Sequence, residues 1–223
     1  NVPTEANWRY TFGGSVGNSY DVANAVYNNV KFDHSADTST NNYGIYLGDS
    51  GTKLYINTYG GALHQYALST PYNISTASLV RSVTVPTFYN FVFSIDFKPD
   101  GTKMYALQFA GTGANDSSVR EYTLSTAWDI STLSYVTIYD LSAQFDYQGG
   151  RGIRFKPDGT SFYAVNRAVP STFFQYNLST AWDLSTTSYS NKSFATSTSH
   201  GYHDLAFNGD GTKVFAIDTT NSL

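Results

Sequence analysis

Short apolar runs separated by turn sequences recur along the whole chain. In one unit, a run from Gly152 to Phe155 leads into a Pro-Asp-Gly-Thr sequence. Such a turn closes a hairpin, because Pro presets φ and Gly accepts a positive φ. Two further runs follow in each unit, as at 104–107 and 119–124, and a fourth begins near Tyr27, Leu79, Tyr135 and Tyr189. The pattern predicts four short antiparallel strands in each unit.

Two motifs show that these units are copies of one another. The first runs from Lys98 to Tyr105 and returns at 156–163, and in looser form at 49–55 and 210–215. The second runs from Tyr122 to Thr132 and returns at 66–76 and 176–186. In its degenerate fourth copy, four extra residues separate 10–12 from 20–22. Self-similarity at a fixed period indicates a repeat architecture.

Four copies of a four-stranded unit predict an all-β protein of one domain, 1–223: a β-propeller of four blades. The expected blades are 43–85, 92–140, 151–194, and a fourth that joins 202–217 to 7–32. The last copy stops after its second strand, whereas the chain opens with a third and a fourth strand. We therefore expect the N-terminal strands to complete the last blade and close the ring, which would cover two sheet edges. Strand exchange with a neighbouring molecule is the alternative to this intramolecular closure, so the chain is expected as a monomer or a strand-exchanged oligomer.

The Pro-Asp-Gly-Thr-Lys motif resembles the YVTN-like repeats of bacterial and phage propellers. The Leu-Ser-Thr-Ala-Trp-Asp-Ile-Ser-Thr motif, at 124–132, is similar to repeats encoded by marine bacteria and their phages. The resemblance covers nearly the whole chain and implies the propeller fold, although many of these relatives have more than four blades. It implies little about function, because such repeats occur in enzymes, lectin-like binders and virion proteins alike.

The composition excludes several partners. The net charge is −4 and no cluster of Lys and Arg is present, so we expect no nucleic-acid partner. No apolar run approaches the roughly 20 residues that span a bilayer, so we expect no membrane insertion. The chain has no Cys, which excludes disulfides, thiol catalysis and Cys-ligated zinc.

Residues required in every blade are expected to serve packing, so candidate site residues should differ among the blades. By this argument Tyr20, Tyr72, Trp128 and Trp182 are packing residues. Equivalent positions just before the inner strands hold four different side chains, and further polar residues lie near them. We expect these residues to line the mouth of the central channel and bind a ligand such as a glycan: Asn42, Tyr43, Asn90, Phe93, Gln148, Arg151, His200, Tyr202 and His203. The alternative is that they only fill the channel.

The sequence shows no convincing catalytic set. Gly13-Gly14-Ser15-Val16-Gly17 matches a nucleophile-elbow pattern but lacks the helix that should follow it. His200, His203 and Asp204 could supply metal ligands without completing a site. Asp96 and Arg154 occupy matching positions of adjacent blades, and we expect them to form an ion pair. We therefore expect no catalytic residue and no cofactor, with a channel-bound Ca or Zn as the exception left open.

These observations favour a non-enzymatic propeller that acts in attachment, assembly or ligand binding, with a glycan or a surface protein as its partner. We expect it outside the cell, on a cell surface or on a virion. Two alternatives stay open. One is a lactonase-like propeller hydrolase or lyase with a metal in the channel, and the other is a structural protein that polymerises by strand exchange.

Overall fold

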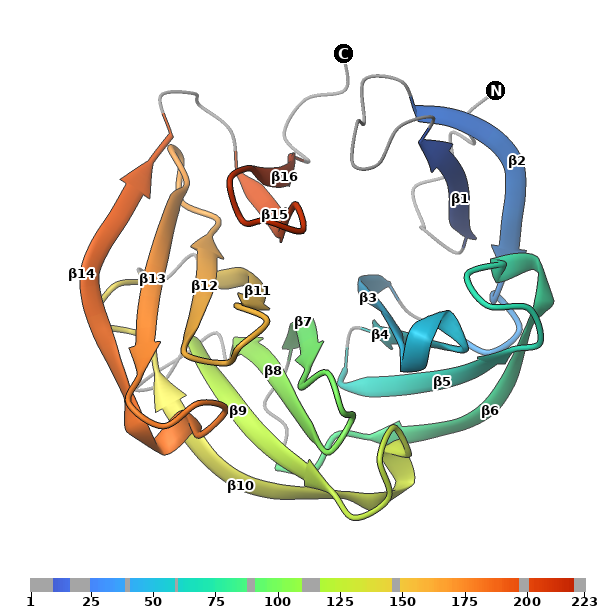
Figure 1. The fold of residues 1–223 in the computed structure, drawn as a ribbon, viewed down its shortest axis with the longest axis horizontal. Helices are drawn as coiled ribbons and strands as arrows, with labels where there is room; N and C mark the ends of the chain where they lie inside the picture. The colour runs from blue at the N-terminus through green and yellow to red at the C-terminus, as the bar shows by residue number, and fades with distance from the viewer. Residues whose placement is uncertain are drawn as a thin grey trace.

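The computed structural model describes residues 10–16, 25–38, 41–58, 60–87, 91–109, 117–145, 149–196 and 201–218, and their side chains from residue 30 onward. The chain folds into sheets that radiate from a common axis (Figure 1). The fold is therefore all-β and propeller-like.

Three of the sheets are complete blades of four antiparallel strands. The first contains β3 (Asn42–Gly48), β4 (Lys53–Thr58), β5 (Ala62–Leu68) and β6 (Ala77–Thr84). The second contains β7 (Phe91–Phe97), β8 (Lys103–Phe109), β9 (Ser117–Leu124) and β10 (Leu133–Asp140). The third contains β11 (Gly150–Phe155), β12 (Ser161–Asn166), β13 (Thr172–Leu178) and β14 (Thr187–Ala195). Strands β3, β7 and β11 lie nearest the axis, and β6, β10 and β14 form the rim (Figure 1). We call these sheets blades 1, 2 and 3.

The repeated polar residues build the turns between strands. Asp100 accepts hydrogen bonds from the backbone N–H and the hydroxyl of Thr102, and Gly101 between them has a φ of 72°. Asp129 accepts from the backbone N–H of Ser131 at 2.9 Å and so caps the 3-10 turn η4 (Ile130–Thr132). Short polar side chains that bond to nearby backbone N–H groups favour this kind of turn, which explains their recurrence.

Two further sheets have two strands each. One pairs β1 (Tyr10–Val16) with β2 (Ala25–Asp33), and the other pairs β15 (Tyr202–Phe207) with β16 (Val214–Asp218). In the first, Val16 faces Ala25, nine positions later, just as Leu124 faces Leu133 in blade 2. This hairpin therefore has the length of the others. The prediction of four extra residues in this copy is therefore wrong. The register places Gly14, and not Tyr10, at the position that Tyr122 holds in blade 2.

Among the described strands, no ladder joins β1 to β16. The two short sheets lie on either side of an opening in the ring (Figure 1). Phe32 of β2 packs against Tyr66 of blade 1, with ring centroids 5.0 Å apart. At the other end, Phe207 of β15 packs against Tyr163 of blade 3, at 4.6 Å. Closure of a four-bladed ring by the N-terminal strands therefore stays a prediction.

An aromatic side chain closes the joint between successive blades. A Cβ at Gly48 of blade 1 would lie 2.4 Å from the Trp128 ring of blade 2, so only glycine fits there. The hydroxyl of Tyr55 in blade 1 donates to the backbone carbonyl of Trp128 at 2.7 Å. In the next joint, Tyr105 donates in the same way to Trp182 at 2.6 Å. These contacts agree with the packing role predicted for the two tryptophans.

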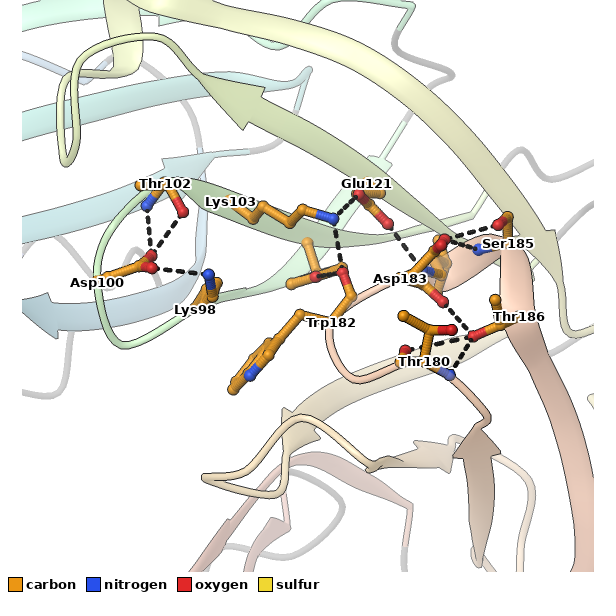
Figure 2. A network of polar contacts seen from close by, with 12 residues as sticks. Lys98, Asp100, Thr102, Lys103, Glu121, Thr180, Trp182, Asp183, Ser185 and Thr186 are labelled. Carbon is orange, nitrogen blue, oxygen red and sulfur yellow. Dashed lines mark hydrogen bonds and ion pairs between the residues drawn. The ribbon is translucent and has the colours of Figure 1, made fainter.

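A buried carboxylate reinforces the joint between blades 2 and 3 (Figure 2). Glu121, which is 1% exposed, forms an ion pair with Lys103 of its own blade at 2.6 Å. Its second oxygen accepts the backbone N–H of Leu184 in blade 3 at 2.7 Å. In the preceding joint, Gln65 accepts from the backbone N–H of Ile130 at 3.2 Å, so an amide can do the same work. The shared element of both joints is the buried acceptor.

We therefore expect Glu121→Ala to lower the free energy of unfolding by about 3 kcal/mol, because it leaves a buried N–H without a partner. Glu121→Gln keeps an acceptor, as Gln65 does, and should cost about 1 kcal/mol. Chemical denaturation at neutral pH measures both values. Equal losses in the two variants would show that the ion pair, and not the acceptor, stabilises the joint.

Candidate functional site

Each of the four inner strands has a β-bulge at the same point of the repeat. The register of the ladder shifts between Asn42 and Gly44 and at the equivalent points of β7, β11 and β15. A bulge leaves one residue out of the ladder and redirects its side chain. The residues in the bulges are four of those predicted for the channel mouth: Tyr43, Phe93, Arg151 and His203.

Three of these side chains touch one another across blades 1, 2 and 3. The rings of Tyr43 and Phe93 meet edge to face, with centroids 4.8 Å apart. The guanidinium carbon of Arg151 lies 3.9 Å from the Phe93 centroid and 5.7 Å from that of Phe109. Phe93 and Arg151 are both 6% exposed. The bulges thus form a continuous aromatic and cationic cluster, which we call the bulge cluster (Tyr43, Phe93, Phe109 and Arg151).

Arg151 is a buried cation held mainly by aromatic rings. No described carboxylate lies within ion-pair distance of it, and its Nε is buried without a hydrogen-bond partner. Its Nη1 donates to the backbone carbonyl of Gly150 at 3.2 Å. The pKa of Arg151 is lowered to about 10, mainly by burial and also by the nearby Arg167, against the opposite effect of Tyr43. Stacking on Phe93 offsets part of the cost of desolvating this charge.

The other residues predicted at the channel mouth are more exposed than Phe93 and Arg151 or lie outside the described part of the chain. Asn42, Tyr202 and His203 are half-buried at the beginnings of β3 and β15. The backbone N–H of Tyr202 donates to the Ser171 hydroxyl at 2.9 Å. Three predicted residues lie outside the described part of the chain: Asn90, Gln148 and His200.

A polar cluster bridges the inner strands of blades 2 and 3 and β15. Arg154 forms an ion pair with Asp204 at 2.8 Å and donates to the Ser94 hydroxyl at 3.1 Å. The predicted ion pair between Asp96 and Arg154 is therefore wrong. Asp96 instead accepts the backbone N–H groups of Phe97 and Phe155, at 2.9 and 2.7 Å, and so ties β7 to β11.

Burial raises the pKa of both acids in this cluster. It raises the pKa of Asp96 to about 6, although Arg154 and the two N–H donors act in the opposite direction. It also raises the pKa of Asp204, against the effect of Arg154. One feature of the sequence distinguishes Asp204 from the equivalent residues of the other blades. It is the only acid at its repeat position, where the other blades have Gly44, Ser94 and Gly152.

Within the described residues, no group of three or more His, Cys, Asp and Glu side chains is placed to hold a metal ion. None of the helices in that same part of the chain is long and apolar enough to span a membrane.

Comparison with known proteins supports the fold. No protein-family model matches the chain, and no curated protein matches it. Among solved structures, a putative 6-phosphogluconolactonase from Bacteroides uniformis matches with a TM-score of 0.54 and 14% identity, over 88% of this chain and 55% of that one. Another from Bacteroides fragilis matches with a TM-score of 0.53 and 14% identity, over 83% and 49%. The β-propeller domain of Cps50 (Swd1) from Myceliophteria thermophila gives 0.52 and 11%, over 86% and 56%. The chain thus spans about half the length of these propellers.

The raised pKa of Asp96 predicts a pH-dependent contribution to stability. The folded chain holds the Asp96 proton up to about pH 6, whereas the unfolded chain releases it near 3.8, so lowering the pH through 6 favours the folded state. The free energy of unfolding of the wild-type chain, compared with that of Asp96→Asn, should therefore rise as the pH falls from 7 to 4. The rise should approach about 3 kcal/mol.

Denaturation of both proteins at several pH values checks this prediction. The other acids are common to the two chains and cancel in the difference, except for Asp204, whose charge acts on Asp96. Asp96→Asn also loses one carboxylate oxygen as an acceptor. The stability lost in this way does not depend on pH, so it does not change how the difference varies with pH. A difference that does not vary with pH would contradict the raised pKa.

Proposed function

We propose that this chain is a non-enzymatic propeller that binds a glycan at the end of the ring where the four bulges lie. The observation that carries the proposal is the bulge cluster. Equivalent bulges in β3, β7, β11 and β15 place different side chains at one end of the inner strands, and three of these side chains are in contact. Residues that differ among otherwise similar blades are the ones expected to serve recognition and not the scaffold.

The chemistry of this end suits a sugar. The half-buried Tyr43, Tyr202 and His203 offer ring faces and polar edges at the surface. Behind them, stacking on Phe93 fixes the Arg151 guanidinium, whose donors suit hydroxyl or carboxylate oxygens. A donor that is already positioned loses little conformational entropy when a ligand binds.

The two acids with raised pKa values support a role other than catalysis. Asp96 is held by two backbone N–H groups, and Asp204 by Arg154 and the Leu205 N–H. Each carboxylate therefore already has partners that join neighbouring inner strands. We further propose display on a cell surface or a virion, which rests on the resemblance of the repeats to those of bacterial and phage propellers.

A glycan array with the purified chain, followed by calorimetric titration of the best ligand, tests the proposal. We expect Tyr43→Ala to weaken binding at least tenfold, or about 1.4 kcal/mol, because it removes a ring face from the site. Tyr135→Ala changes a tyrosine on the outer strand β10 and should leave the affinity unchanged. Absence of binding by the wild-type chain, or equal losses in both variants, would refute the proposal.

A further inference from the structure

Each of the two short sheets has the strands of half a blade. In each complete blade the two inner strands precede the two outer strands. β15 and β16 carry the sequence of an inner pair, and β1 and β2 have the hairpin register of an outer pair. Each half lacks the other, so among the described strands one edge of β16 and one edge of β1 have no ladder partner. An open strand edge is a template for pairing with another strand.

The face of blade 3 is built as a joint, but among the described strands only the two-stranded sheet of β15 and β16 lies on it. The joint-forming residues of blade 2 are all buried: Tyr105, Val119 and Glu121. Their equivalents in blade 3 are only half-buried, and they line a groove of about 270 Å³ that reaches Phe207 and Val214: Tyr163, Phe173 and Gln175. Phe194, at the rim of the groove, is 64% exposed. Blade 3 thus offers a partly covered joint of the kind that holds blades 2 and 3 together.

Blade 1 and β16 also have exposed residues at positions that a joint would cover. Tyr72 lies over its turn glycine with the positive φ that Trp128 also has, but it is 68% exposed where Trp128 is 9% exposed. On β16, Val214 is 45% and Ile217 is 63% exposed. Their equivalents in blade 2, Met104 and Leu107, are completely buried. The residues that would join a complete fourth blade to blade 3 on one side and to blade 1 on the other are therefore exposed or half-buried.

The geometry disfavours closure within one chain. The two half-blades are each attached to a different end of the row of three blades, β2 through Phe32 and β15 through Asp204. Bringing them together would require each joint to turn further, yet the joints are close-packed, as the Gly48–Trp128 contact shows. The curvature is also that of a larger ring, since 88% of this chain matches 55% of a longer propeller.

We propose that two copies of this chain close one ring, in which β16 of each copy pairs with β1 of its partner. The arrangement is a two-fold symmetric dimer, with a completed blade at each of its two joints. The partner's β1–β2 hairpin occupies the groove on blade 3, and its β15–β16 pair covers Tyr72. From the β8–β9 register, where Ala106 faces Arg120, Ala216 should face the partner's Phe12. This inference does not depend on the proposed glycan site.

Light scattering on a dilution series tests the stoichiometry. We expect a mass twice the 24.5 kDa of the chain. Ile217→Lys places a charge in the joint and should give a folded monomer, with an unchanged circular dichroism spectrum. Val136→Lys changes another exposed β-branched residue, on the outer strand β10, and should remain a dimer. A wild-type monomer or an open-ended polymer would overturn the proposal.

Cysteine cross-linking tests the strand pairing, because the chain has no Cys of its own. Ala216→Cys and Phe12→Cys proteins, mixed and oxidised, should form a covalent heterodimer, since directly opposed Cβ atoms are about 4.5–5.5 Å apart. Thr11→Cys in place of Phe12→Cys is the matched control and should cross-link poorly, because successive positions of a strand alternate between its two faces. A chain that carries both Ala216→Cys and Phe12→Cys should also give covalent dimers. A disulfide formed within one chain would show intramolecular closure and refute the dimer.

Discussion

Each blade is held to the next by an aromatic turn that closes over a glycine, and the rest of the molecule depends on this joint. Trp128 occupies the space above Gly48 that a larger residue would fill, while Tyr55 and Gln65 satisfy the backbone polar groups of the turn. Non-directional packing and directed hydrogen bonds therefore act at the same place. A joint of this kind sets the angle between sheets and leaves little freedom to change it.

The fixed angle between blades also determines what can meet at the axis. Because the inner strands β7, β11 and β15 lie next to one another, Arg154 of β11 reaches Asp204 of β15, and Asp96 of β7 reaches the backbone of β11. The bulges at the ends of the same strands turn Phe93 and Arg151 towards each other. The backbone is thus similar from blade to blade, and the side chains at the bulges differ among the blades.

The sequence predicted the blades well because the signals are local. Pro-Asp-Gly turns, capped 3-10 turns and a constant repeat period fix each sheet without reference to distant contacts. The equivalence of Tyr43, Phe93, Arg151 and His203 was also visible from spacing alone, although the bulges were not. The partner of Arg154 was mispredicted because matching repeat positions do not reveal which acceptors the backbone already occupies. In the degenerate N-terminal copy, Tyr10 was wrongly matched to the tyrosine that begins the second motif. A hairpin register depends on cross-strand pairing and not on a single recurring residue.

The joints of this molecule are not interchangeable, because equivalent positions in them hold different polar residues. In the joint between blades 1 and 2, Gln65 stands beside Arg81, which bonds to Asp129 of the next blade. Between blades 2 and 3 the same strand position holds Glu121, which is neutralised by a lysine of its own blade. The open face of blade 3 has Gln175 opposite Lys192, an amide beside a cation, and so repeats the first pattern. These differences distinguish the joints, because Arg81 needs an acid on the next blade, whereas Glu121 has its cation within its own blade.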